Sequence, residues 1–162
     1  MIIYLIRHGI TDACNNDQII DKNVYLNELG ISQIKFISDL IPKNHNYKIF
    51  CSDTKRTIQT ANIINDCLFT NYEIKIDNRL LNKNCNDDLY YINIHCFLKE
   101  ILELYENVIL ITHGKIIKMI LSIIKFHKID KSYTDSLDLG YGSIFILDEK
   151  LNIKLYNHHL IT

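Results

Sequence analysis

The sequence from residue 2 to residue 11 reads Ile2-Ile3-Tyr4-Leu5-Ile6-Arg7-His8-Gly9-Ile10-Thr11. Its run of five apolar residues suits one buried strand and is too short for a helix. In an α/β sheet, ligands bind at the carboxyl ends of such strands. Arg7 and His8 stand at that end, where charged donors beside an imidazole suit an anion, above all phosphate. The alternative is that the two side chains only solvate a strand end, and the rest of the chain must decide between them.

Two further strand ends carry the same kinds of residue. Residues 108–112 form a second apolar run, and His113 and Gly114 follow it. Residues 47–51 read as a shorter strand, and Arg56 falls in the first turn of the helix expected after it. Parallel strands end at one edge of a sheet, so these side chains are expected to converge with Arg7 and His8. The helix N-termini there add backbone donors and a favourable dipole for an anion. The sequence therefore predicts a phosphate pocket.

The composition is that of an ordinary globular protein. With 162 residues, 48% of them apolar, we expect one domain over residues 1–162 with a substantial core. The net charge of −1 and the absence of long runs of like charge or a leader-like start predict no nucleic-acid partner, no membrane partner and a cytoplasmic location. Five scattered cysteines lack metal-ligand spacing, so we expect reduced thiols and no metal site. No feature indicates an oligomeric state.

Strands and helices alternate through the first three quarters of the chain. This order predicts an α/β fold, a three-layer sandwich whose mostly parallel central sheet has helices on both faces. Two final strands should add antiparallel edges. We expect residues 73–77 to alternate as a half-exposed strand, and residues 78–90 to be irregular. A helix over about 92–106 should face inward with Phe97, Ile101, Leu104 and Tyr105, and another should cover about 115–126. The last strands are expected at 143–147 and 151–155.

Several motifs occur in order along the chain. Residues 7–11 match the pattern RHGxT, and residues 26–33 follow LTxxGxxQ with Asn27 as a helix cap. Residues 52–61, SDTKRTIQTA, match SxxxRxxQTA, and residues 111–114 carry a second histidine motif. Together these motifs resemble those of the histidine phosphatase superfamily, in its phosphoglycerate mutase-like branch. The size of the chain is closest to the short phosphatase-type members.

The resemblance implies a role for each residue of the pocket. His8 is the nucleophile, which forms a phosphohistidine that water then hydrolyses. Its attacking nitrogen must be neutral, and a backbone carbonyl must hold its other nitrogen. Arg7, Arg56 and His113 bind the phosphoryl oxygens and stabilise charge in the transition state. No cofactor is implied. The further residues expected to bind phosphate are Thr11, Asn15, Gly114 and, from the late turn at Gly142, Ser143.

The sequence departs from the family pattern at two places. Cys14 stands where the family has an asparagine, and the adjacent Asn15 or Asn16 is the replacement we expect. Asn82 stands where the family has the glutamate that protonates the leaving oxygen. Asp87 or Asp88 could supply that proton instead, or the leaving group could be good enough to depart without it.

Three functions remain open from the sequence. The first is a metal-independent phosphatase acting on a phosphorylated small molecule or a phosphoprotein, including phosphohistidine. The second is a degenerate relative that only binds phosphate, suggested by Asn82 and Cys14. A phosphoglycerate mutase is third, because the short segment between Asn82 and His113 leaves little to cover the site.

Overall fold

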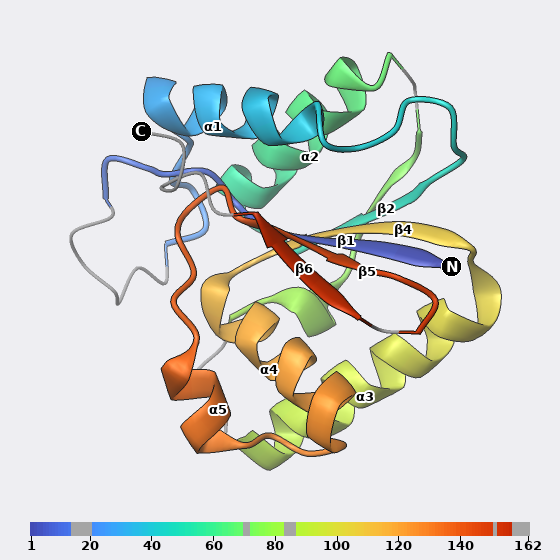
Figure 1. The fold of residues 1–162 in the computed structure, drawn as a ribbon. Coiled ribbons are helices and arrows are strands. Elements are labelled where there is room, and N and C mark those ends of the chain that lie inside the picture. The colour runs from blue at the N-terminus through green and yellow to red at the C-terminus, as the bar shows by residue number, and fades with distance from the viewer. Residues whose placement is uncertain (14–20, 70–71, 83–86, 151, 157–162) are drawn as a thin grey trace.

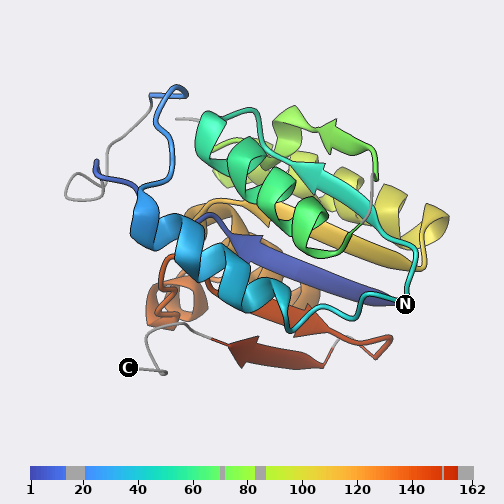
Figure 2. The same ribbon diagram turned by 90° about the horizontal axis from the view of Figure 1, so that it is seen from above.

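The computed structural model describes residues 1–13, 21–69, 72–82, 87–150 and 152–156. They form three layers, with a central sheet between two sets of helices (Figures 1 and 2). The α/β architecture predicted from the sequence is thereby confirmed. In chain order the elements are β1 (Ile2–Arg7), α1 (Glu28–Ser38), β2 (Lys48–Cys51), α2 (Lys55–Cys67), β3 (Ile74–Ile76), η1 (Asn78–Leu80), α3 (Asp87–Leu104), β4 (Asn107–Thr112), α4 (Gly114–Phe126), α5 (Lys131–Ser136), β5 (Ile144–Leu147) and β6 (Ile153–Tyr156).

The sheet has the strand order β3-β2-β4-β1-β5-β6. Strands β3, β2, β4 and β1 run parallel, whereas β5 is antiparallel to β1 and β6 is antiparallel to β5. The apolar runs of β1 and β4 lie at the centre, where helices cover both faces and no alternation with polar residues is needed. Their register pairs Arg7 with Thr112. The two strands therefore end level, at the same edge of the sheet.

Helices α1 and α2 cover one face of the sheet. Asn27 caps α1 as predicted, since its side chain accepts a hydrogen bond of 2.9 Å from the backbone N–H of Gly30. The apolar stripe of each helix packs against the strands beneath it. The core on this side includes Ile34 and Ile37 of α1, Ala61 and Ile64 of α2, and Ile6, Ile49, Ile109 and Ile111 of the sheet.

Helices α3 and α4 cover the other face, and α5 lies beside α4 (Figure 1). The core here is the larger of the two and includes Leu5, Leu110 and Phe145 of the sheet, Ile94, Phe97 and Ile101 of α3, and Ile116, Ile117 and Ile120 of α4. None of the described helices is long and apolar enough to span a membrane.

Some local predictions were wrong. Helix α3 begins at Asp87 rather than near residue 92, so part of the expected irregular segment is helical. Leu104 is 63% exposed because the helix ends there, while Tyr105 turns back onto Phe50 with ring centroids 5.7 Å apart. Ile76 is 53% exposed because it is the last residue of a three-residue edge strand. The short helix α5, capped by the Asp130 side chain, was not predicted.

Candidate active site

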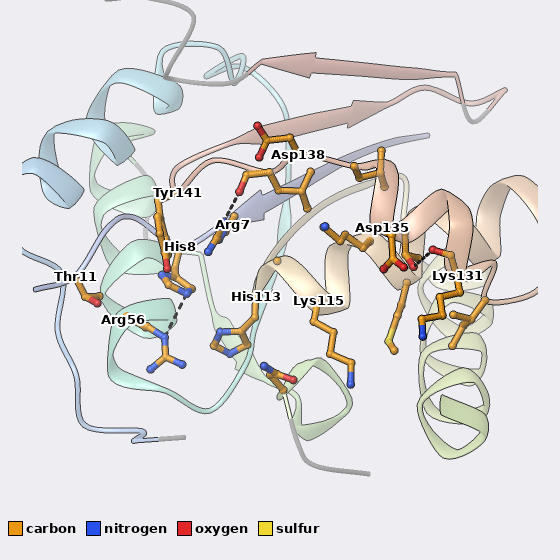
Figure 3. Close-up of a pocket in the computed structure, with 18 residues that line it drawn as sticks. Arg7, His8, Thr11, Arg56, His113, Lys115, Lys131, Asp135, Asp138 and Tyr141 are labelled. Carbon is orange, nitrogen blue, oxygen red and sulfur yellow. Dashed lines mark hydrogen bonds between the residues drawn. The ribbon is translucent and has the colours of Figure 1, made fainter. Parts of the chain in front are cut away.

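The level ends of β1 and β4 bring the two predicted histidines together. His8 and His113 follow the paired residues Arg7 and Thr112, and their ring centroids are 5.2 Å apart. Both rings line a cavity of about 800 Å³, which Arg7 and Arg56 also line. Figure 3 shows these four side chains grouped at one end of that cavity. The residues come from three different strand ends, as the sequence predicts.

The His8 ring is held by a hydrogen bond from each side. Its Nδ1 lies 2.8 Å from the carbonyl oxygen of Gly9, which can only accept, so the ring hydrogen is on Nδ1. Nε2 then carries the lone pair and accepts from Nε of Arg56 at 3.3 Å. Burial lowers the pKa of His8 well below its ordinary value, and the nearby His113, Arg56 and Arg7 lower it further. The result is a neutral imidazole with an unprotonated Nε2.

Arg7 is fixed by the chain that leads into β5. Its Nη1 donates to the carbonyl oxygen of Leu139, and its guanidinium lies 3.6 Å from the centre of the Tyr141 ring. The guanidinium also lies against Gly114, where a Cβ would stand 3.5 Å from the Arg7 carbon Cζ. A planar cation held between an aromatic ring and a backbone has a defined direction for its donors.

Arg56 stands in the first turn of α2 and is only 8% exposed. Besides its contact with His8, its Nη1 donates to the carbonyl oxygen of Asp21 at 2.9 Å. These two bonds fix the guanidinium plane beside the His8 ring. Lysine carries its three N–H donors on one nitrogen and cannot reproduce this planar fork of two separated donor atoms.

A chain of buried hydroxyls holds His113. Its Nε2 lies 2.8 Å from Oγ of Ser52, which in turn donates to Oγ1 of Thr57 at 3.0 Å. Oγ1 of Thr57 donates back to the carbonyl oxygen of Ser52 at 2.7 Å. Burial, with Arg56 and Arg7 nearby, lowers the pKa of His113 from 6.5 to about 3. The ring is therefore neutral at neutral pH.

The start of α1 supports the loop that carries His8. A Cβ on Gly9 would lie 2.5 Å from the carbonyl oxygen of Gly30, and a Cβ on Gly30 would lie 2.2 Å from that of Ile10. The backbones are therefore in direct contact. Oε1 of Gln33 accepts from the N–H of Ile10 at 3.0 Å. This contact explains why glycine and glutamine follow the nucleophile motif at those positions.

Only some of the other predicted site residues line the cavity. Thr11, Asn82 and Gly114 line the cavity. Ser143 does not: it is fully buried below the cavity, its carbonyl oxygen accepts from the N–H of Arg7, and its hydroxyl has no hydrogen-bond partner among the described residues. Asn15, like Cys14 and Asn16, lies outside the described residues.

The two candidate acids are at the start of α3. Asp88 is exposed there and is not among the residues that line the cavity. Asp87 is the first residue of the helix, and its side chain lies outside the described part of the structure. The described side chain of Asp88 therefore offers no proton donor to the cavity.

The cavity continues along α4 to α5, where sequence reasoning predicted no site residues. Lys115 directly follows the second histidine motif, and Tyr141 directly precedes Gly142. Their proximity to these motifs could have indicated both residues. No comparable signal marks α5. Within the described chain, no group of three or more His, Cys, Asp or Glu side chains is placed to hold a metal ion. The additional lining residues with polar side chains are Lys115, Lys118, Lys131, Thr134, Asp135, Asp138 and Tyr141.

Comparison with solved structures shows the same fold across nearly the whole chain. A protein of Escherichia coli K-12 provisionally assigned as an alpha-ribazole-5'-P phosphatase has a TM-score of 0.78 and 16% identity, over 97% of this chain and 96% of that one. A mycobacterial glucosyl-3-phosphoglycerate phosphatase has a TM-score of 0.74 and 17% identity, over 96% and 97% of the two chains. The phosphoglycerate mutase of Bacillus anthracis has a TM-score of 0.74 and 14% identity, over 97% and 92%.

Membership of a family rests on the sequence rather than on these distant structures. A comparison with curated proteins gives no match. The family model described as the histidine phosphatase superfamily (branch 1) matches residues 3–87, a stretch that contains both His8 and Arg56. The chain belongs to branch 1 of the histidine phosphatase superfamily.

Proposed function

We propose that this protein is a metal-independent phosphatase that hydrolyses phosphate monoesters, or phosphohistidine, through a phosphohistidine on His8. The observation that carries the proposal is the state of the His8 ring. Its Nδ1 is held by the Gly9 carbonyl, and its Nε2 presents a lone pair within the cavity, beside Arg56. A buried, neutral, oriented imidazole is what a nucleophile requires.

The proposed reaction has two displacements at phosphorus. In the first, the hydrogen bond from Arg56 Nε to Nε2 of His8 is released, and Nε2 bonds to phosphorus while the bond to the leaving oxygen breaks and its electron pair stays on that oxygen. In the second, water bonds to phosphorus and the bond to Nε2 breaks, which releases phosphate and restores His8. Arg7 and Arg56 offer fixed donors to the phosphoryl oxygens through both steps.

His113 responds to the charge of the substrate in this proposal. Burial and the two arginines keep its pKa near 3. A bound phosphate dianion supplies the opposite charge at short range and so favours the protonated ring. His113 would then act as a third cation beside the phosphoryl group.

A cytoplasmic location is part of the proposal. The described thiols Cys51, Cys67 and Cys96 are unbridged, in keeping with a reducing compartment. Two structural neighbours are named as phosphatases of alpha-ribazole-5'-P and of glucosyl-3-phosphoglycerate, which supports a phosphomonoester as the substrate.

The test is the hydrolysis of p-nitrophenyl phosphate in the presence of EDTA. This substrate needs little protonation of its leaving oxygen, so the missing carboxylic acid does not limit it. We expect wild-type turnover and a loss of about 10⁴-fold or more in His8→Ala. His95→Ala, which changes an exposed histidine of α3, is the matched control and should keep full activity. Equal turnover in wild type and His8→Ala would refute the proposal.

The second candidate is a protein that binds phosphate without turning it over. Asn82 favours it, because this residue lines the cavity and cannot act as a carboxylic acid. It predicts no hydrolysis by the wild type, together with a rise in Tm on addition of inorganic phosphate. Robust turnover of any phosphate monoester would exclude it, and phosphoryl transfer between two positions of one phosphoglycerate would indicate a mutase instead.

A further inference from the structure

The side of the cavity beyond His113 holds an amide and an ammonium group. In the proposed reaction the leaving oxygen departs opposite Nε2 of His8, because the attacking and leaving atoms lie roughly in line. Asn82 and Lys115 line the cavity together with His113. In the view of Figure 3, Lys115 extends from the first turn of α4, and His113 lies between it and His8.

The described carboxylates of the cavity lie elsewhere. Asp135 belongs to α5, whereas Asp138 lies in the segment after α5, next to Leu139, whose carbonyl oxygen accepts from Arg7. Figure 3 shows Asp135 beside Lys131 and Asp138 on the other side of Arg7 from His113. Neither stands where an acid would meet a leaving oxygen opposite His8.

One buried tyrosine positions the amide and the ammonium together. Tyr90 is only 2% exposed, and its hydroxyl donates a long hydrogen bond of 3.4 Å to Oδ1 of Asn82. Its ring centre lies 4.7 Å from Nζ of Lys115, a distance at which the cation is attracted to the ring face. Because Oδ1 of Asn82 is used in this way, the Nδ2 donor is left for the cavity.

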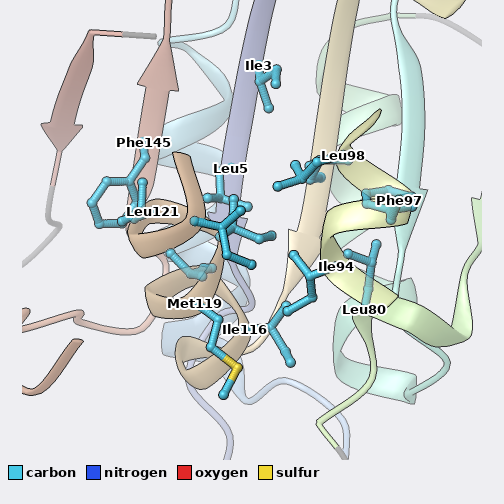
Figure 4. Packing of buried hydrophobic residues seen from close by; sticks show 14 of the residues in the cluster. Ile3, Leu5, Leu80, Ile94, Phe97, Leu98, Ile116, Met119, Leu121 and Phe145 are labelled. Atoms are coloured by element: carbon cyan, nitrogen blue, oxygen red, sulfur yellow. The ribbon is translucent and has the colours of Figure 1, made fainter. Parts of the chain in front are cut away.

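The backbone that carries Lys115 is firmly anchored. The next residue, Ile116, is fully buried, and α4 packs against β1 and α3 through a continuous apolar cluster that also contains Leu5, Ile94 and Leu121 (Figure 4). No described carboxylate lies within 4 Å of Nζ of Lys115. The charge of Lys115 is therefore not neutralised by an ion pair with the described chain.

We infer that Lys115, positioned by Tyr90 and aided by Asn82, stabilises the departing oxygen of the substrate in place of a carboxylic acid. The inference rests on the proposed phosphatase activity. When the phosphorus–oxygen bond breaks, its electron pair remains on the leaving oxygen, which accepts a hydrogen bond from Nζ of Lys115. A leaving oxygen more basic than the amine takes the proton, and the amine regains one from water.

The benefit from Lys115 depends on the basicity of the leaving oxygen. A weakly basic aryl oxide is stable as an anion, so it gains only the hydrogen bond from the ammonium group. An alkoxide gains both the hydrogen bond and the proton. Loss of Lys115 should therefore cost little with good leaving groups and progressively more with poor ones.

The experiment measures kcat/KM for a series of aryl phosphates of increasing leaving-group pKa and one alkyl phosphate. It compares wild type with Lys115→Met, with Lys115→Arg, and with the control Lys125→Met. Lys125 is an exposed lysine of the same helix that also contacts an aromatic ring, 4.6 Å from Tyr133, and it does not line the cavity. Thermal unfolding of each variant checks that the fold is kept.

We expect Lys115→Met to lose less than about threefold with p-nitrophenyl phosphate and about 10²-fold with the alkyl phosphate, the scale of one lost transition-state donor. Lys115→Arg should recover part of the loss, and Lys125→Met should match wild type throughout. A uniform loss across the series, or none, would overturn the inference while leaving the phosphatase proposal intact. A wild type that hydrolyses none of the substrates would overturn both.

Discussion

Acid should destabilise this protein through His113, by an amount that follows from the structure. The ring is 5% exposed and lies near two arginines, which hold its pKa near 3 against an ordinary value of 6.5. Between these two pKa values, the unfolded chain binds a proton at this histidine and the folded protein does not. Stability is therefore complete above about pH 6.5 and falls as the pH drops toward about 3.

The size of the effect is about 2 kcal/mol between about pH 7.5 and about pH 5, at 1.36 kcal/mol for each pH unit well below the unfolded pKa. The comparison is with His113→Asn, which does not titrate and places a good capping residue at the start of α4. His8 is also neutral in the folded protein over this range. Its own contribution is present in both proteins, so the difference between them reports mainly on His113.

The assay is urea unfolding of both proteins at the two pH values. Wild type should lose about 2 kcal/mol more of its free energy of unfolding than His113→Asn on going to about pH 5. Nuclear magnetic resonance gives an independent check, since the ring signals of His113 should not titrate over this range. An equal acid loss in the two proteins would refute the argument that burial and the arginines keep the ring neutral.

Three other predictions concern the site. Arg56→Lys should lower kcat/KM for p-nitrophenyl phosphate about 10²-fold with little change in Tm, because lysine lacks the planar fork whose separate nitrogens donate to His8 and to the Asp21 carbonyl. Because the pKa of His8 is lowered, kcat/KM corrected for substrate ionisation should stay level as the pH falls below about 6.5. A fall in the corrected kcat/KM that begins at about pH 6.5 would contradict this. Gly30→Ala should lower the free energy of unfolding in urea by about 1–3 kcal/mol and reduce activity, because the new Cβ would lie 2.2 Å from the Ile10 carbonyl oxygen. Ser32→Ala, on the exposed face of α1, is the control.

The parts of the site that could be predicted are those fixed by sheet geometry. Two apolar runs of similar length, each ending in histidine and glycine, predict two central parallel strands. Parallel pairing then brings the two histidines to one edge, and the observed register makes their rings neighbours. Arg56 follows for the same reason, because a helix that starts at a strand end presents its first turn to that edge. These placements need only the backbone.

The parts that could not be predicted depend on side chains meeting across the fold. The contact of Lys115 with Tyr90 joins α4 to α3, and Asn82 reaches the same ring from the segment between η1 and α3. No spacing in the sequence signals that meeting. The role predicted for Ser143 also depends on side-chain packing, since the turn at Gly142 lies where expected but Ser143 is fully buried and is not among the residues that line the cavity.

The proposed role of His8 as a nucleophile and the expected acid sensitivity of the fold have one physical cause. An imidazole attacks phosphorus only when it is unprotonated, and the protein secures that state by burying the ring among His113, Arg56 and Arg7. The same burial and the same arginines keep His113 neutral. In acid the unfolded chain therefore binds protons at both histidines that the folded protein does not bind, and the folded state loses stability. A bound phosphate dianion makes protonation of His113 more favourable, because its negative charge offsets the positive charge of the arginines. Binding of the phosphate dianion should accordingly be accompanied by proton uptake at His113.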